Sequence, residues 1–239
     1  MTRTRFHQEL ETLRQKLLEM AGMAEQAIER VREAYRRHDI ALCRQVLENE
    51  PAINRAEREI DELALDLLAM QQPMAVDLRF ILACIKINAD LERVGDQAVN
   101  IAERVMDMGS HPSADLPIDL PRMASVAAGM VRRALEAFLE GDAGLAQAVL
   151  EMDDLVDRMN RDAYISMSKL MKSSPELAAQ ALDALLIARN LERVADHATN
   201  IAEDVIFWVR GADVRHHADT GEISEEGDDA PGPAGGKTV

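Results

Sequence analysis

The sequence predicts an all-α fold: two tandem antiparallel three-helix bundles, made of six long helices and related by an internal repeat. The first observation is the repeat itself, because LERVGDQAVNIAERV at Leu91–Val105 returns as LERVADHATNIAEDV at Leu191–Val205, with 11 of 15 positions identical. The second is composition: 47% of the residues are hydrophobic but only 3% are aromatic, which is typical of helices with aliphatic cores. The third is the three- and four-residue spacing of apolar side chains along most of the chain.

The first half contains three expected helices. Apolar residues recur at helical spacing over residues 6–38, and Asp39 is a suitable N-cap for the helix that follows. Pro51 falls inside this second helix, where we expect a kink or a restart because proline lacks the amide donor. Gln71-Gln72-Pro73 interrupts the pattern, and a third helix then runs to residue 108.

The second half repeats this plan after a linker that is rich in proline. Three further helices are expected at about residues 122–140, 142–172 and 175–210. Short turns between them make neighbouring helices antiparallel. The segment from residue 212 onward carries seven acidic and two basic residues and cannot bury apolar surface. The expected organisation is a first bundle at residues 1–110, a linker at 111–121, a second bundle at 122–210 and an acidic disordered tail at 211–239.

Composition and charge also exclude several classes of protein. The formal net charge of -16 disfavours nucleic acids and anionic lipid surfaces as partners, since both require basic protein surface. No apolar run reaches the ~18 residues of a transmembrane helix, and the charged N-terminus has no signal-peptide core. We therefore expect a cytoplasmic protein. Cys43 and Cys84 each lie among aliphatic residues and outside any CxxC motif, which predicts two reduced core thiols.

The repeated helix carries a stripe of acidic and amide side chains. At about 100° per residue, the pattern Glu-x-x-x-Asp-x-x-x-Asn-x-x-Glu that begins at Glu92 stays within about 80°, whereas Leu91 and Val94 lie roughly opposite. The stripe therefore faces away from the core of its own bundle. A solvated surface is one interpretation, but like charges one turn apart destabilise a helix by about 0.2–0.5 kcal/mol per pair. Because the pattern recurs in both halves while intervening positions differ, we favour a function for the acids.

The functional interpretation of the stripe is a metal site. Carboxylates one turn apart can share a divalent cation, and asparagine can add a carbonyl oxygen. Two further acidic pairs with this spacing, Glu57 with Asp61 and Asp153 with Asp157, precede the repeated helices. If each pair lies beside the stripe of its own half, several oxygen ligands converge on a divalent ion such as Fe, Zn, Mn or Mg. The candidate ligands are Glu92, Asp96, Asn100, Glu103, Glu192, Asp196, Asn200, Glu203, Glu57, Asp61, Asp153 and Asp157.

Three functional classes follow from the residues alone. An interaction protein that docks through helix surfaces is favoured, because the chain has no nucleophile motif, no Gly-rich phosphate loop and no Cys near a His, and hence no candidate catalytic residue. The alternative is a metal-dependent carboxylate-cluster enzyme, either a hydrolase or a redox protein. Ferritin-type enzymes of this kind need Glu-x-x-His on two helices, and the chain contains none. The third class is a helical scaffold whose acids only increase solubility.

The chain resembles a known family, the PhoU family of phosphate-transport regulatory proteins. The resemblance spans residues 6–210, and the combination of motifs is specific although each one is short. A second copy of the motif, at residues 191–203, is similar to the second half of that family. The motifs in the first half are Gln71-Gln72-Pro73-Met74-Ala75-Val76-Asp77-Leu78-Arg79, Leu91-Glu92-Arg93-Val94-Gly95-Asp96 and Asn100-Ile101-Ala102-Glu103.

The resemblance implies a tandem of three-helix bundles, a cytoplasmic location and a homodimer. It also implies a negative regulator of phosphate uptake and of the phosphate-starvation response. Such a regulator couples a phosphate ABC transporter, through its ATPase, to a phosphate-sensing histidine kinase by protein-protein contacts. It meets the membrane only peripherally, through these complexes. The metal-cluster motifs known in some members fall here on Glu92/Asp96 and Glu192/Asp196.

This chain departs from the family pattern in its second half. Ser173-Ser174-Pro175-Glu176 replaces the Gln-Gln-Pro turn, and no Asp-Leu-Arg follows it. Asn54 and Tyr164 also occupy repeat positions where the opposite half has Asp157 and Asp61. The two metal sites are therefore expected to bind metal unequally, or one of them is expected to be empty.

Overall fold

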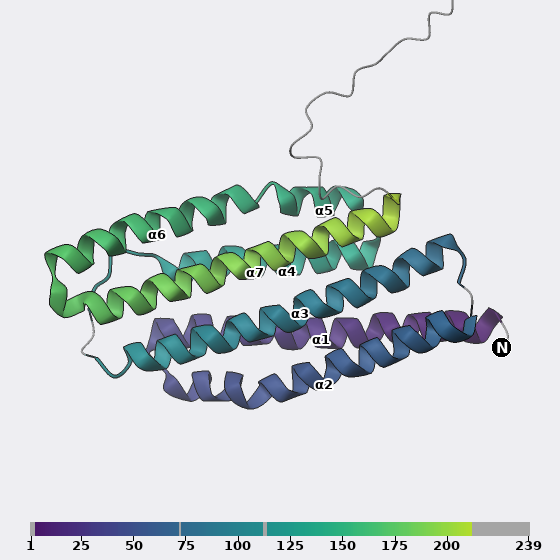
Figure 1. The fold of residues 1–239 in the computed structure, drawn as a ribbon, viewed down its shortest axis with the longest axis horizontal. Helices are drawn as coiled ribbons and strands as arrows, with labels where there is room; N and C mark the ends of the chain where they lie inside the picture. The colour runs from purple at the N-terminus through teal and green to yellow at the C-terminus, as the bar shows by residue number, and fades with distance from the viewer. Residues whose placement is uncertain (1–2, 72, 112–113, 212–239) are drawn as a thin grey trace, which may run out of the picture.

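The computed structural model describes residues 3–71, 73–111 and 114–211, and within these ranges it contains helices and no β-strand. The all-α prediction is thus confirmed. The long helices run lengthwise through the molecule (Figure 1). The elements are α1 (Arg3–Arg37), α2 (Ile40–Gln71), α3 (Ala75–Met108), α4 (Leu120–Glu140), α5 (Ala143–Leu150), α6 (Asp153–Ser173), the 3-10 turn η1 (Pro175–Leu177) and α7 (Ala178–Arg210).

The helices are arranged as two sets with the same plan. One set consists of α1, α2 and α3, and the other of α4, α7 and the consecutive helices α5 and α6. Contacts of α3 with α7, and of α1 with α4, join the sets. Figure 1 shows α3 and α7 side by side in the middle of the molecule. The repeated segment therefore occupies equivalent helices, and those two helices form the contact between the sets.

Helix ends follow the capping residues that the sequence supplies. Asp39 accepts hydrogen bonds from the backbone amides of Ala41 and Leu42, so its predicted role as N-cap is confirmed. Asp142 plays the same part for α5 and accepts from the amides of Gly144 and Leu145. These side chains satisfy amides that the first turn of a helix leaves without a backbone partner.

The two sets differ where a break was expected. Pro51 lies inside α2, which nevertheless continues as one helix, whereas the corresponding part of the second set divides into α5 and α6 at Glu151 and Met152. The loss of one amide donor at Pro51 does not end a helix whose Ile53 and Ile60 are buried in the core. The restart expected at Pro51 is therefore absent, and the break lies instead at the corresponding place of the second set, between α5 and α6, where the sequence has no proline.

The buried side chains form one continuous, mainly aliphatic core that extends through both sets of helices. Leu91 and Val94 lie in this core, as the helical spacing predicts. Cys43 and Cys84 are buried free thiols, which confirms the prediction made for them. Burial raises the pKa of Cys43 to about 11, so this thiol stays protonated and unreactive at neutral pH.

An aromatic cluster joins three helices at one end of the molecule. Phe80 of α3 stacks on Phe138 of α4 with ring centroids 5.7 Å apart, and Trp208 of α7 lies 5.3 Å and 5.4 Å from these two rings. Arg79 Nε donates a hydrogen bond of 3.2 Å to the carbonyl of Trp208. Arg79 of the first set therefore holds the end of α7 from the second set.

The remaining sequence-based expectations concern segments between and beyond the helices. The expected linker at 111–121 ends earlier than predicted, because α4 begins at Leu120. Asp119 caps this helix by accepting a hydrogen bond of 3.0 Å from the backbone amide of Arg122. In the part of the chain that the structure describes, no helix is both long and apolar enough to cross a membrane. The predicted disordered tail lies outside the described residues, apart from Gly211.

Phe138→Ala is expected to lower the free energy of unfolding by about 3–5 kcal/mol, because the ring is fully buried between two other rings. Leu139→Ala is the matched control: its side chain is 39% exposed, and the expected loss is below about 1 kcal/mol. Urea unfolding followed by circular dichroism measures both. Equal losses for the two variants would contradict the role given to the aromatic cluster.

Candidate functional site

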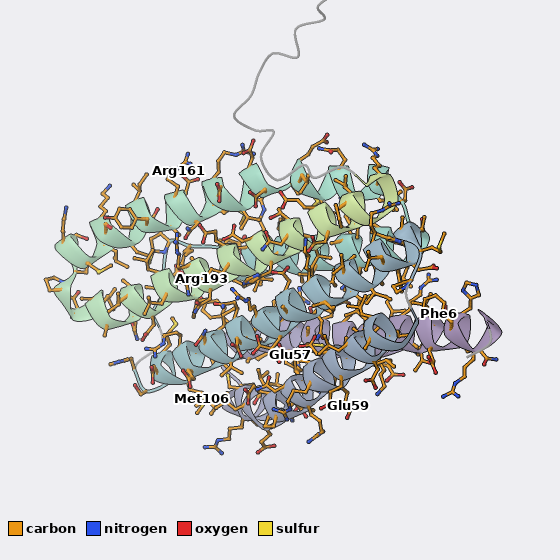
Figure 2. All side chains as sticks on the ribbon, turned by 45° about the vertical axis from the view of Figure 1, so that its right-hand side comes forward. Phe6, Glu57, Glu59, Met106, Arg161 and Arg193 are labelled. Carbon is orange, nitrogen blue, oxygen red and sulfur yellow. The ribbon has the colours of Figure 1, made fainter. Side chains whose placement is uncertain are left out.

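The stripe on α3 contributes to a first carboxylate cluster, which we define as Glu50, Glu57, Asp61, Glu92 and Asp96. Glu92 and Asp96 are half-buried on α3, beside acids from α2. Burial raises the pKa of Glu92, and the neighbouring carboxylates of Asp96 and Glu57 raise it further. The pKa of Glu57 is raised by burial and then by Asp61. Figure 2 labels Glu57 where α2 meets α3. Glu57 therefore lies beside Glu92 and Asp96 as expected, and Asp61 meets α3 at Asn88.

A buried asparagine that the sequence analysis missed organises the α2 side of the first cluster. Asn88 Nδ2 donates to Asp61 Oδ1 at 2.9 Å and to the backbone carbonyl of Glu57 at 3.0 Å. The Oδ1 atom of Asn88 is buried without a hydrogen-bond partner. Its signal in the sequence is weak, because the equivalent residue of the second half is Ala188. Asn88 fixes Asp61 and leaves a buried carbonyl oxygen at the same place.

Glu50 is the second residue that sequence reasoning missed. Its carboxylate raises the pKa of Asp96, after the larger effect of burial, and also that of Glu92. The sequence did contain a signal, because the offset of 103 residues between α2 and α6 equates Glu50 with Asp153. Glu50 also precedes Glu57 by two helical turns and so shares its face of α2.

Gly95 allows α2 to lie close to α3 at this cluster. A Cβ atom at Gly95 would stand 3.0 Å from Ile53 Cδ1, closer than carbon atoms normally pack. Ile53 is buried against α3, on the same helix as the α2 acids. The equivalent position of α7 is Ala195. The absence of a side chain at Gly95, between Glu92 and Asp96, thus brings the acids of the two helices together.

The second carboxylate cluster consists of Asp153, Asp157, Glu192 and Asp196. Burial, then Asp157, then Asp196 raises the pKa of Asp153. The pKa of Asp196 is likewise raised by burial and by Asp157. The pair on α6 therefore lies beside the pair on α7, as the sequence predicts for this half.

Glu192 of the second cluster is largely enclosed, with 13% of its side chain exposed. Its Oε1 accepts from Arg189 Nη1 at 3.1 Å, whereas its Oε2 is buried without a hydrogen-bond partner. Burial raises its pKa, and Asp196 adds to the effect. An enclosed carboxylate oxygen without a donor is an unsatisfied acceptor that a cation can satisfy.

The last two residues of each stripe, an asparagine and a glutamate, are not members of the two carboxylate clusters. Asn200 Nδ2 donates to Asp90 Oδ1 of α3 at 3.1 Å, and His197 Nδ1 lies 2.8 Å from the same oxygen. Glu203 lines a small pocket between α3 and α7 together with Asp90. Asn200 and Glu203 thus face α3. The remaining two candidates, Asn100 and Glu103, have exposed side chains on α3.

The donor chemistry of both clusters suits a divalent cation, but their present geometry is not closed around one. Carboxylate and amide oxygens are the ligands that hard cations prefer, and buried oxygens without partners occur at Asn88 and Glu192. Among the described residues, however, no three acidic, histidine or cysteine side chains converge closely enough to hold a metal ion. Metal binding therefore requires side-chain rotation, and the ligand set remains a prediction.

The fold and the clusters together define a class: a duplicated helical bundle whose repeated helices each carry partly exposed carboxylates beside a neighbouring helix. Comparison with known proteins gives the family. The model of the PhoU domain matches residues 17–105 and 120–205. The chain therefore belongs to the PhoU family.

Several relatives are similar over most of their length. The phosphate-specific transport system accessory protein PhoU homolog of Pseudomonas aeruginosa is 39% identical over 214 residues, which cover 88% of each chain. Homolog 1 of Thermotoga maritima is 31% identical and covers 94% of this chain and 97% of its own. The crystal structure of PhoU from Pseudomonas aeruginosa has a TM-score of 0.82 at 37% identity, covering 87% of this chain and 100% of that one. These names describe an accessory protein and state no catalytic activity.

Glu92→Gln/Asp96→Asn is expected to stabilise the protein at pH 7 in the presence of a chelator, by about 0.5 kcal/mol. The folded protein holds protons on these groups more tightly than the unfolded chain, since their pKa values are raised. Their contribution to stability is therefore full at low pH and is lost as the pH rises through the raised pKa values. The extra stability of the variant relative to the wild-type protein should disappear below about pH 4, where the wild-type carboxyl groups are protonated as well.

Glu59→Gln is the control for this prediction. Glu59 Oε2 accepts from Lys16 Nζ at 2.7 Å, and this hydrogen bond lowers the pKa of Glu59. Its neutralisation should leave stability unchanged or reduce it at pH 7. Thermal unfolding at pH 7 and pH 4 compares the variants. A stability loss in Glu92→Gln/Asp96→Asn at pH 7 would contradict the electrostatic interpretation of the cluster.

Proposed function

We propose that the protein is a negative regulator of phosphate uptake and of the phosphate-starvation response. It couples a phosphate ABC transporter, through its ATPase, to a phosphate-sensing histidine kinase by protein-protein contacts, as a cytoplasmic homodimer. Membership of the PhoU family supports a role in the regulation of phosphate transport. The observation that carries the proposal is the match of both repeats to this family, together with relatives named as accessory proteins of the phosphate transport system.

One surface suits contact with the membrane-bound machinery. We define the α2–α3 turn patch as Leu65, Met74, Val76 and Leu78, whose side chains are between 38% and 77% exposed. An exposed apolar patch of this kind is typical of a protein-protein contact, and the unbranched Met74 can adapt to a partner. Met74, Val76 and Leu78 belong to the segment that resembles the family signature. We assign the contact with the transporter or the kinase to this patch.

Deletion of the gene is expected to raise phosphate uptake and phosphate-starvation gene expression severalfold in phosphate-replete medium. A plasmid copy of the wild-type gene should restore repression, and Met74→Glu/Val76→Glu should fail to do so at equal protein level, because it puts charge into the docking patch. Glu59→Gln, on an exposed side chain elsewhere on α2, is the matched control and should restore repression. Unchanged phosphate control in the deletion strain would overturn the proposed function.

We further propose that divalent cations bind at both carboxylate clusters and support this function. The first cluster would use Glu57, Asp61, Glu92 and Asp96, and the second Asp153, Asp157, Glu192 and Asp196. A bound cation supplies positive charge to clustered carboxylates. The protein residues contribute oxygen ligands on two helices at each cluster, so that binding also ties α2 to α3 and α6 to α7. The pKa values of Glu92 and Glu192 are raised by burial and, after that, by neighbouring carboxylates, and this concentration of negative charge favours the proposal.

Mn²⁺, Zn²⁺ or Fe²⁺ is expected to raise the melting temperature of chelator-treated protein. At a cation concentration of about 100 Kd the stabilisation is about 2.7 kcal/mol. Glu92→Gln/Asp96→Asn/Glu192→Gln/Asp196→Asn should abolish this shift, while Glu103→Gln, on an exposed side chain of α3, should retain it. Differential scanning fluorimetry with metal analysis of the purified protein tests both. A shift that survives in the fourfold variant would place the cation elsewhere.

A further inference from the structure

We propose that the acidic segment at residues 222–229 docks on a basic, partly apolar surface of α6 and α7 in the same chain. This contact goes beyond the proposed function and does not rest on it. The α6–α7 surface consists of exposed side chains from two helices in contact. Its basic members are Arg158, Arg161, Lys169 and Lys172 of α6, and its apolar members are Tyr164 and Ile165 of α6 with Leu182 and Leu186 of α7.

The α6 side of this surface is basic although the protein is acidic. Between Arg158 and Lys172 the chain has four basic residues and one acidic residue, Asp162. The corresponding residues 55–69 of α2, at the offset of 103, include two basic and five acidic residues. Because the formal net charge of the chain is -16, a local excess of positive charge attracts acidic segments to this surface.

The four basic side chains are not used within the described fold. Among the residues that the structure describes, none of the four takes part in an ion pair. Arg189 of α7 differs, because it pairs with Glu192 at 3.1 Å, and it is therefore not counted in the surface. Arg161 is labelled along the outer edge of α6 in Figure 2. The positive charge on α6 is thus available to an acidic segment.

Exposed apolar side chains lie among these charges. Tyr164 and Ile165 are 61% and 59% exposed, and Leu182 and Leu186 are 48% and 38% exposed. Tyr164 and Leu186 line a groove of about 490 Å³ between the two helices. At offsets of 103 and 100 residues, Tyr164, Ile165 and Leu186 stand where the first repeat has charged residues. The combination of apolar and basic side chains is therefore a property of the second repeat, and it is typical of a binding surface.

The segment at residues 222–229 has the matching chemistry. It contains five acidic residues, no basic residue and one branched apolar residue, Ile223. Its acids can face the basic side chains of α6 while Ile223 enters the apolar groove. The α2–α3 turn patch does not suit this segment, because Asp66 and Asp77 directly follow two of its apolar residues and would repel the acids.

The chain is long enough for this contact. Helix α7 ends at Arg210, so Leu186 lies about 36 Å from that end at about 1.5 Å per residue. The 13 residues from Arg210 to Ile223 span up to about 43 Å when extended. A segment attached to the surface in this way has an effective concentration of about 1 mM, which compensates for the weakness of single exposed ion pairs.

Paramagnetic relaxation in the full chain tests the proposal. A nitroxide label attached to Ser224→Cys reacts with the introduced thiol, because Cys43 and Cys84 are buried. The amide signals of Tyr164 and Leu186 are expected to lose intensity severalfold at low salt. They should recover at about 1 M NaCl, where the screening length falls to about 3 Å.

Charge variants give the matched control. Arg158→Glu/Arg161→Glu should remove the loss of intensity, because it reverses two charges of the surface. Arg55→Glu/Arg58→Glu makes the same change at the equivalent positions of α2 and should leave the loss unchanged. Circular dichroism checks that both variants are folded. Signals that are unaffected by the label, or that respond equally in the two variants, would overturn the proposal.

Two further measurements exclude other occupants of the surface. Spin-labelled chain mixed with isotope-labelled chain should cause no loss of intensity, because the contact lies within one chain, and a loss would assign the surface to a contact between copies. Phosphatidylglycerol vesicles should shift the signals of Tyr164 and Leu186 only when Glu222→Gln/Glu225→Gln/Glu226→Gln has weakened the segment. A shift of equal size in the wild-type chain would overturn the proposal and assign the surface to lipid.

Discussion

The packing of α3 against α7 is the contact on which the rest of the structure depends. Both helices carry the repeated segment, and each buries the apolar face of that segment in the common core. Lys86 pairs with Asp204 at 3.2 Å and Arg104 with Asp183 at 3.5 Å, so the helices run antiparallel with charged pairs toward both ends. Since one face of each helix is occupied by this contact, the acidic face is left to meet α2 or α6. The carboxylate clusters thus result from the same arrangement that joins the repeats.

Most of the fold could be predicted because helical spacing and repetition are properties of the sequence itself. The ends of α3, the cap at Asp39 and the burial of Cys43 and Cys84 all follow from local patterns. The division between α5 and α6 could not be predicted in this way, because no proline or glycine marks it. A short local pattern also cannot show which of two neighbouring helices a polar side chain will face. Asn200 is an example, because it donates a hydrogen bond to Asp90 of α3.

The candidate site was only partly accessible from the sequence. The acidic pairs on α2 and α6 lie beside the stripes as expected, since spacing by one helical turn fixes the face on which they lie. Asn88 and Glu50 were missed for different reasons. Asn88 acts through a contact between α2 and α3 that a single helix does not reveal. Glu50 corresponds to Asp153 when the repeats are aligned. It was missed because only acidic pairs spaced by four residues were considered, and Glu50 is not part of one.

Trp208 is the single tryptophan of the chain, and its position has a consequence for spectroscopy. Its indole lies against Phe80 of the first helix set and Phe138 of the second. Separation of the two sets, without unfolding of either, would expose this ring to water and move its fluorescence emission to longer wavelength. The natural sequence therefore contains an optical probe for the relative movement of its halves, with no added label.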